Sequence, residues 1–132
     1  MAYGQAYQAY QENSISTASP EQLTLQLYNG CIKFIKLSKR AIENESIEEK
    51  NINIQKAQNI ISELRATLNM DYDISHQLMP LYEYINHRLT QANFKSDVSM
   101  LNEAQQMVEQ FRDTWKEVMK ANRVQSQKAG VQ

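Results

Sequence analysis

Apolar residues recur at every third or fourth position in four stretches of this chain, and short polar breaks separate the stretches. They cover about residues 20–44, 47–70, 74–94 and 98–123. Such spacing lines up apolar side chains on one face of an α-helix, whereas a half-buried strand requires strict alternation. The pattern therefore predicts four amphipathic helices, each about 30–38 Å long at 1.5 Å per residue.

The first stretch begins with the clearest local signal, Ser19-Pro20-Glu21-Gln22. Ser19 is a good N-cap, proline suits the first helical position, and Gln22 stands where a capping box needs it. One apolar seam of this helix comprises Leu23, Leu27, Cys31, Phe34, Ser38 and Ala41. A second stripe beside it comprises Leu25, Tyr28, Ile32, Ile35 and Ile42. The double stripe has two interpretations, a thick core or a groove for a partner.

The other three helices each have one main inward stripe, which Ile52 and Ile60 widen in the second helix. In the second it comprises Ile54, Ala57, Ile61, Leu64 and Leu68, in the third Leu78, Leu81, Tyr82, Ile85, Leu89 and Ala92, and in the fourth Leu101, Val108, Phe111, Trp115 and Val118. We expect Asp71 or Asp73 to cap the third helix. Pro80 lacks a backbone donor, so we expect it to kink or interrupt the start of that helix.

Short connections between long helices require neighbours to run antiparallel. The fold class is therefore all-α, an antiparallel up-down-up-down four-helix bundle over residues 19–123. We expect residues 124–132 to be a disordered tail. We expect residues 1–18 to be a flexible N-terminal segment; they contain one charged side chain and carry Tyr7, Tyr10 and Ile15 among polar residues. This segment is either a frayed terminus or a strap that docks reversibly on the bundle.

The amino-acid composition argues against several classes of function. The 132 residues are 42% hydrophobic and 22% charged, with a net charge of −1 and a pI near 6.1, which argues against nucleic acid as the main partner. A single cysteine, Cys31, excludes an intramolecular disulfide. No apolar run approaches 18 residues and no signal peptide is visible, so we expect a cytoplasmic protein without membrane insertion.

Side chains for catalysis or metal binding are sparse. His76 and His87 share one predicted helix eleven positions apart, about 16 Å along its axis, too far to share a metal ion. Cys31 lies on the apolar face of its helix, where a small buried residue is expected rather than a nucleophile. We therefore expect no enzyme, no metal and no cofactor.

The surplus of apolar positions on the first two helices instead suggests binding. A groove between helices can receive an amphipathic helix of a partner, and methionines on flanking positions add adaptable contact area. The tyrosine-rich segment 1–18 would then shield the empty groove, because exposed apolar patches promote aggregation.

Several short motifs, in order along the chain, resemble the FliS family of flagellin-specific export chaperones of bacteria. They are Thr17-Ala18-Ser19-Pro20, Leu27-Tyr28-Asn29-Gly30, Lys56 to Leu64, Leu81-Tyr82-Glu83-Tyr84, Arg88-Leu89, Ala92-Asn93, Asp97, and Phe111 to Trp115. Tyr7 and Tyr10 also match a tyrosine pair that precedes the opening motif in this family.

The resemblance implies a cytoplasmic chaperone without ATPase activity that binds the carboxy-terminal segment of flagellin. Such a protein prevents premature polymerisation and delivers flagellin to the flagellar type III export apparatus. The predicted partners are flagellin, with the export gate and an anti-sigma factor as further candidates, and a homodimer is a further expectation. The predicted contact residues are Tyr7, Tyr10, Ile15, Leu25, Tyr28 and Ile32. The alternative is a non-enzymatic helical module that regulates or self-assembles, such as an anti-sigma factor binder.

Overall fold

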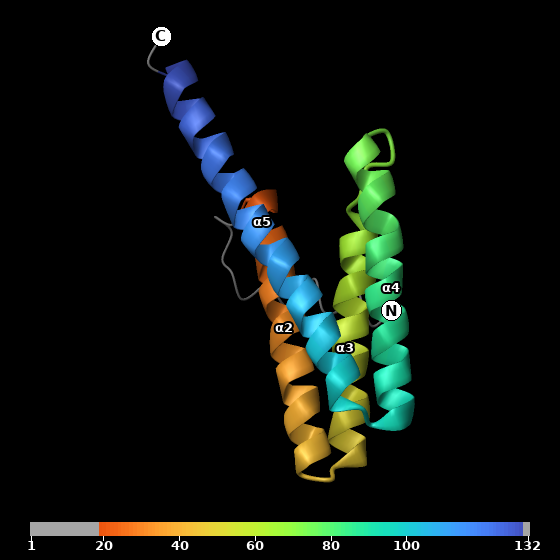
Figure 1. Cartoon of the computed structure of the whole chain (residues 1–132). Helices are drawn as coiled ribbons and strands as arrows, with labels where there is room; N and C mark the ends of the chain where they lie inside the picture. The colour runs from red at the N-terminus through yellow and green to blue at the C-terminus, as the bar shows by residue number, and fades with distance from the viewer. Residues whose placement is uncertain (1–18, 131–132) are drawn as a thin grey trace.

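The structure of this chain is a computed structural model that describes residues 19–130, with side chains through residue 127. It holds four helices, α2 (Pro20–Glu43), α3 (Ile47–Ala66), α4 (Asp73–Lys95) and α5 (Val98–Gly130). Each helix contacts its neighbours in the cycle α2–α3–α4–α5, and successive helices run in opposite directions (Figure 1). The predicted antiparallel four-helix bundle is confirmed. The segment 1–18 lies outside the described residues.

The capping box at the start of α2 is present. The backbone nitrogen of Gln22 donates to Ser19 Oγ at 3.1 Å, and the backbone nitrogen of Ser19 donates to Gln22 Oε1 at 3.1 Å. Two otherwise unpaired donors are satisfied in this way, as the local sequence predicts.

The turn between α2 and α3 takes three residues. Glu45 adopts a left-handed conformation with φ of 57°, and Ser46 then caps α3 by accepting from the Glu49 nitrogen at 3.4 Å. Lys50, in the first turn of α3, is buried and donates to the carbonyl of Asn93 and to Ser96 Oγ, both at 2.8 Å. This lysine ties the start of α3 to the end of α4.

The connection between α3 and α4 differs from the expectation. Helix α3 ends at Ala66 rather than near residue 70, and Tyr72 is the N-cap of α4 without a side-chain bond, so neither Asp71 nor Asp73 is the cap. Helix α4 continues through Pro80 without interruption. Residues 67–72 thus form a longer turn than the apolar spacing indicated.

The core contains the predicted seams, with most of the second stripe of α2 added to them. Its buried members include Leu27, Tyr28, Cys31, Ile32, Ile35, Ile54, Ile60, Ile61, Leu64, Tyr82, Ile85, Leu89, Leu101 and Val108. Two residues expected to face inward do not, because Leu81 is 41% exposed and Val118 is 39% exposed. Tyr82 points into the core, and Leu81, about 100° around the helix from it, lies on the side that faces solvent.

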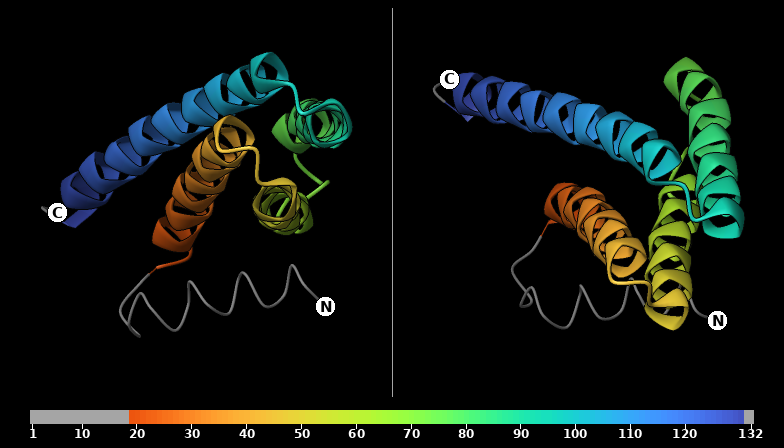
Figure 2. Two further views of the ribbon diagram at one scale, coloured as in Figure 1. Left: turned by 90° about the horizontal axis from the view of Figure 1, so that it is seen from below. Right: turned by 60° about the horizontal axis from the view of Figure 1, so that its bottom comes forward.

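Toward the C-terminal end of α5, this helix diverges from α4 and stays beside α2 (Figures 1 and 2). It continues to Gly130, so the expectation of disorder is wrong for residues 124–130. The physical reason is local, since four of the six residues 124–129 are Gln, Lys or Ala, which favour helix, and no proline or glycine occurs before Gly130. None of the helices between residues 19 and 130 is long and apolar enough to cross a bilayer.

Candidate partner-binding site

Tyr28, a predicted contact residue, lies in the core of the bundle. It is 5% exposed, and its hydroxyl oxygen is 2.6 Å from that of Tyr82 on α4. Its ring stacks on Phe111 of α5 with centroids 6.4 Å apart, and Tyr82 meets the edge of the same Phe111 ring at 5.4 Å. Tyr28 therefore joins three helices and offers little surface to a partner.

Leu25 lies nearer to the surface, whereas Ile32 is as buried as Tyr28. Ile32 is 4% exposed and lies on the wall of an open hollow of about 390 Å³ between α2 and α5. Leu25, half-buried, shares the helical face of Ile32 and lies about two turns toward the start of α2. The lining residues of the hollow are Asn29, Ile32, Lys33, Lys36, Leu37, Arg40 and Arg112.

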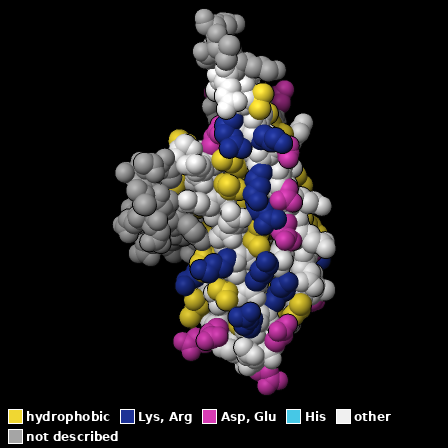
Figure 3. Space-filling view, turned by 90° about the vertical axis from the view of Figure 1, so that its left-hand side faces the viewer, with side chains coloured by type: hydrophobic (Ala, Val, Ile, Leu, Met, Phe, Trp, Pro, Cys, Tyr) yellow, Lys and Arg dark blue, Asp and Glu magenta, His cyan; other side chains and the backbone are white. Residues whose placement is uncertain are grey.

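The rim of this hollow is basic. Lys33, Lys36 and Arg40 are exposed on α2, and no acidic residue occurs in α2 between Gln22 and Ile42. Figure 3 views the face shared by α2 and α5, where Lys and Arg side chains follow the length of the molecule, with carboxylates beside them at several levels and at the lower end. The site therefore combines an apolar floor with positive charge around it.

A second open hollow, of about 570 Å³, lies along the C-terminal part of α5. Its lining residues include Glu117, Lys120, Ala121, Val124 and Gln125. Val124 is 44% exposed. The apolar positions of this part of the helix are thus only partly covered.

Two contacts fix this part of α5 to the start of α2. Trp115 Nε1 donates to the carbonyl of Glu21 at 2.9 Å, and Asn122 Nδ2 donates to Glu21 Oε1 at 2.9 Å. The position of α5 alongside the predicted contact residues of α2 is therefore held by specific bonds.

The turn between α3 and α4 carries a third group of exposed apolar side chains, which the sequence analysis missed. Met70 is 41%, Tyr72 63% and Ile74 57% exposed. They alternate with Asp71 and Asp73. This alternation of apolar and acidic residues fits neither a helix seam nor a simple turn. It was the sequence signal that could have indicated these exposed apolar side chains.

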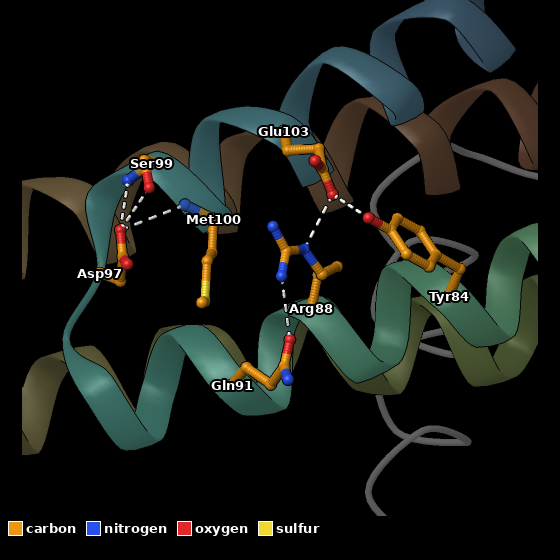
Figure 4. Close-up of polar contacts among 7 residues, drawn as sticks. All are labelled: Tyr84, Arg88, Gln91, Asp97, Ser99, Met100 and Glu103. Atoms are coloured by element: carbon orange, nitrogen blue, oxygen red, sulfur yellow. Dashed lines mark hydrogen bonds and ion pairs between the residues drawn. The ribbon is translucent and has the colours of Figure 1, made fainter.

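Polar contacts at the other end of the bundle hold α5 against α4 (Figure 4). Arg88 Nε donates to Glu103 Oε1 at 2.8 Å, and the Tyr84 hydroxyl donates to the same oxygen at 2.5 Å. These hydrogen bonds, that from Tyr84 first, hold the pKa of Glu103 below its usual value. Asp97 accepts from the Ser99 nitrogen at 2.8 Å and from the Ser99 hydroxyl at 2.6 Å, which starts α5.

Reactive groups do not gather anywhere in the described chain. Burial raises the pKa of the Cys31 thiol to about 12, so its thiolate is scarce near neutral pH. Residues 19–127 hold no group of three His, Cys, Asp or Glu side chains that could bind a metal ion. Glu83 forms an ion pair with Arg65 at 3.5 Å, at a surface where such pairs contribute little.

The remaining predicted contact residues, Tyr7, Tyr10 and Ile15, lie outside the described residues. The structure brings Leu25 and Ile32 onto one face of α2. It buries both Tyr28 and Ile32 in the core, and Ile32 also lines the hollow.

In comparisons with known proteins, the matching family model and the similar relatives agree with each other. The family model described as "Flagellar protein FliS" matches residues 3–122. The chain is similar to the flagellar secretion chaperone FliS of Bacillus subtilis (strain 168), with 50% identity over 93% of this chain and 92% of the relative. It is also similar to the flagellar secretion chaperone FliS of Escherichia coli (strain K12), with 32% identity over 80% of each chain.

A solved structure described as "Crystal structure of flagellar chaperone from bacteria" has a similar fold. The TM-score is 0.72, and the match covers 89% of this chain and 98% of the other. At 22% identity this likeness concerns the fold alone.

Proposed function

Because this chain belongs to the FliS family, we propose that it is a flagellar secretion chaperone that binds the carboxy-terminal segment of flagellin in the cytoplasm. Binding would cover the segment that drives subunit association, prevent premature polymerisation and deliver flagellin to the flagellar type III export apparatus. No enzymatic activity and no cofactor are part of the proposal. The single observation that carries it is the family match over most of the chain.

The surface of the bundle supports a binding function. Large apolar side chains stay exposed after the core is filled, among them Leu81 of α4 and Val118 and Val124 of α5. Two open hollows lie along α2 and α5. An amphipathic helix of a partner gains free energy by covering such side chains, at about 25 cal/mol per Å² of apolar area.

We propose that flagellin follows the face of α2 that carries Leu25 and Ile32 and continues along α5 past the exposed Val118 and Val124. Tyr28 then acts indirectly, by fixing α2 against Phe111 and Tyr82 beneath that face. Tyr7, Tyr10 and Ile15 are proposed to cover the groove until flagellin displaces them.

Ordering a disordered segment offsets part of the contact free energy, so a large interface can still release its partner. This matches the requirement of a chaperone that must hand flagellin over. The export gate is a proposed second partner.

The test is a calorimetric titration of the full chain with a synthetic peptide that spans the carboxy-terminal segment of flagellin from the same bacterium. We expect a 1:1 complex and a gain of helical circular dichroism. Leu25→Asp and Val118→Asp should weaken binding at least about tenfold, since each removes an apolar contact and buries a charge. Ile52→Asp, on an α3 position that is 44% exposed, is the matched control.

Absence of binding at tens of micromolar peptide would contradict the proposal. The alternative function is a helical regulatory module that binds an anti-sigma factor. It would be favoured if the anti-sigma factor of the same bacterium bound under conditions in which the flagellin peptide did not.

A further inference from the structure

The hollow between α2 and α5 lies at one end of the proposed flagellin path. The bond from Trp115 to the carbonyl of Glu21 places this part of α5 beside the start of α2. The exposed Val118, one turn further along α5, lies near that end, and Leu25 and Ile32 follow along α2. Ile32 is about 10 Å from Leu25 along the axis, at 1.5 Å per residue, and lines the hollow. The path therefore reaches the hollow last.

Positive charge surrounds the opening of this hollow. Lys33, Lys36 and Arg40 are exposed at its rim on α2. The ion pairs among residues 19–127 include none of these three side chains. Arg112 adds a fourth cation from α5, and its Nε donates to Asp113 Oδ1 at 3.0 Å. The cations on the α2 side of the rim are thus available to a negatively charged group of a partner.

The charge changes sign just beyond the hollow. Exposed carboxylates occupy the end of α2, the turn after it and the start of α3, at Glu43, Glu45, Glu48 and Glu49. A negatively charged group that follows α2 is attracted at the hollow and repelled by these carboxylates. The surface of α2 therefore favours a partner whose negatively charged group stops at the hollow.

We propose that the hollow binds the free α-carboxylate at the end of the flagellin segment. The inference rests on the proposed function, because a carboxy-terminal segment ends in a free carboxylate. Apolar side chains near that end lie against Ile32 and Leu37, and the carboxylate accepts hydrogen bonds from Lys33 and Lys36. The partner then runs from α5 onto α2 and ends in the same direction as α2.

A helical conformation of the bound segment adds to the same match. The last turn of a helix has carbonyl groups without an intrahelical donor, and the helix dipole places about half a negative charge there. With the end of the segment at the hollow, this partial charge and the carboxylate both face the cations of the rim. The opposite direction would place the positive end of the helix among the same cations. The charges around the hollow therefore favour one direction of the partner over the other.

The test is a calorimetric titration of the full chain with three forms of the flagellin peptide: one with a free carboxylate, one with a carboxamide end, and one lengthened by two glycines. The carboxamide removes the charge and keeps nearly the same shape. The two glycines move the carboxylate by up to about 7 Å. We expect both changes to raise the Kd at least about fivefold in about 50 mM NaCl. The ratio should shrink in about 500 mM NaCl, because salt screens exposed charges.

Variants of the rim locate the carboxylate. Lys36→Gln and the double variant K33Q/K36Q remove exposed charges of α2 and leave the core unchanged. We expect both to weaken binding of the free-acid peptide and to leave binding of the carboxamide peptide nearly unchanged, because the two changes remove the same interaction. Lys95→Gln, at an exposed position on α4, is the matched control and should leave all three titrations unchanged.

Equal affinities of the free-acid and carboxamide peptides would overturn this inference and leave the proposed function intact. A loss in Lys36→Gln that is the same for both peptides would also overturn it, since the rim would then meet acidic side chains within the segment rather than its end. If none of the three peptides bound, the proposed function would itself be contradicted, and this inference with it.

Discussion

The hydroxyl oxygens of Tyr28 and Tyr82 lie 2.6 Å apart inside the bundle and join α2 to α4. These helices are diagonal to each other, since each has α3 and α5 as its neighbours. Phe111 of α5 contacts both rings. Burial raises the pKa of both phenols, so both stay protonated and one donates to the other. The pair fixes the distance across the core by a directional bond.

We predict that Tyr28→Phe and Tyr82→Phe each lower the free energy of unfolding by about 1–2 kcal/mol, because each leaves the other hydroxyl buried without its partner. The double variant should lose clearly less than the sum, since no unpaired hydroxyl is left. Urea unfolding of the four proteins measures the coupling. Losses that simply add would show that the two hydroxyls do not depend on each other.

We predict that Cys31 is unreactive in the folded chain. With a pKa of about 12 and no exposed surface, its thiol should react with Ellman's reagent at pH 8 at least about 100-fold more slowly than in urea-unfolded protein, because the native state must open first. A native rate close to the unfolded one would contradict the burial of Cys31.

We predict that Glu103 makes the bundle sensitive to acid. Its pKa is lowered in the folded state by bonds from Tyr84 and Arg88, so its stabilising contribution is present above the unfolded pKa and is lost as pH falls through the folded pKa. Glu103→Gln should therefore lower the melting temperature at pH 7, and the difference should shrink toward pH 3.

Thermal unfolding by circular dichroism between pH 7 and pH 3 measures the Glu103 effect. Glu117→Gln, at an exposed position on α5, is the control and should leave the melting temperature nearly unchanged. A difference between Glu103→Gln and the unmodified chain that does not vary with pH would contradict the prediction.

We predict that Lys50→Met destabilises the chain by about 1.5–3 kcal/mol, because it removes two hydrogen bonds from a charged donor. Lys50 is buried and holds the carbonyl of Asn93 and the hydroxyl of Ser96. Lys120→Met, at an exposed position, should change stability by less than about 0.5 kcal/mol. Equal effects of the two substitutions in urea unfolding would refute the structural role of Lys50.

We predict that a chain ending at Val124 keeps its stability within about 0.5 kcal/mol, because exposed positions away from the core contribute little. Residues 125–127 are exposed. The mean helical ellipticity should fall because part of α5 is removed. A large loss of stability would show that this end of α5 supports the bundle.

The four helices could be predicted because apolar spacing and capping are local properties of the chain. The capping box that starts α2 involves only Ser19 and Gln22, three residues apart. The seam through Leu27 and Cys31 is buried, as its periodicity indicated. The end of α3 and the cap of α4 were not predicted. No strong local signal marks residues 67–72, and the carboxylates nearby do not act as caps.

The candidate site was only partly predictable. Periodicity places Leu25, Tyr28 and Ile32 on one broad face of α2, but it does not say which of them another helix covers. That is decided by how α4 and α5 pack, and Tyr82 and Phe111 enclose Tyr28. The basic hollow also needed Arg112 of α5 beside Lys33 and Lys36 of α2.

The local pattern of residues along the chain was therefore sufficient to predict the helices, their inner faces and the family. The packing of helices distant in sequence settled the rest: Leu81 is exposed beside a buried Tyr82, and α5 leans toward α2. Spacing specifies the direction of a side chain from its own helix axis. Whether that direction meets protein or solvent depends on where the other axes lie, and only the assembled bundle fixes them.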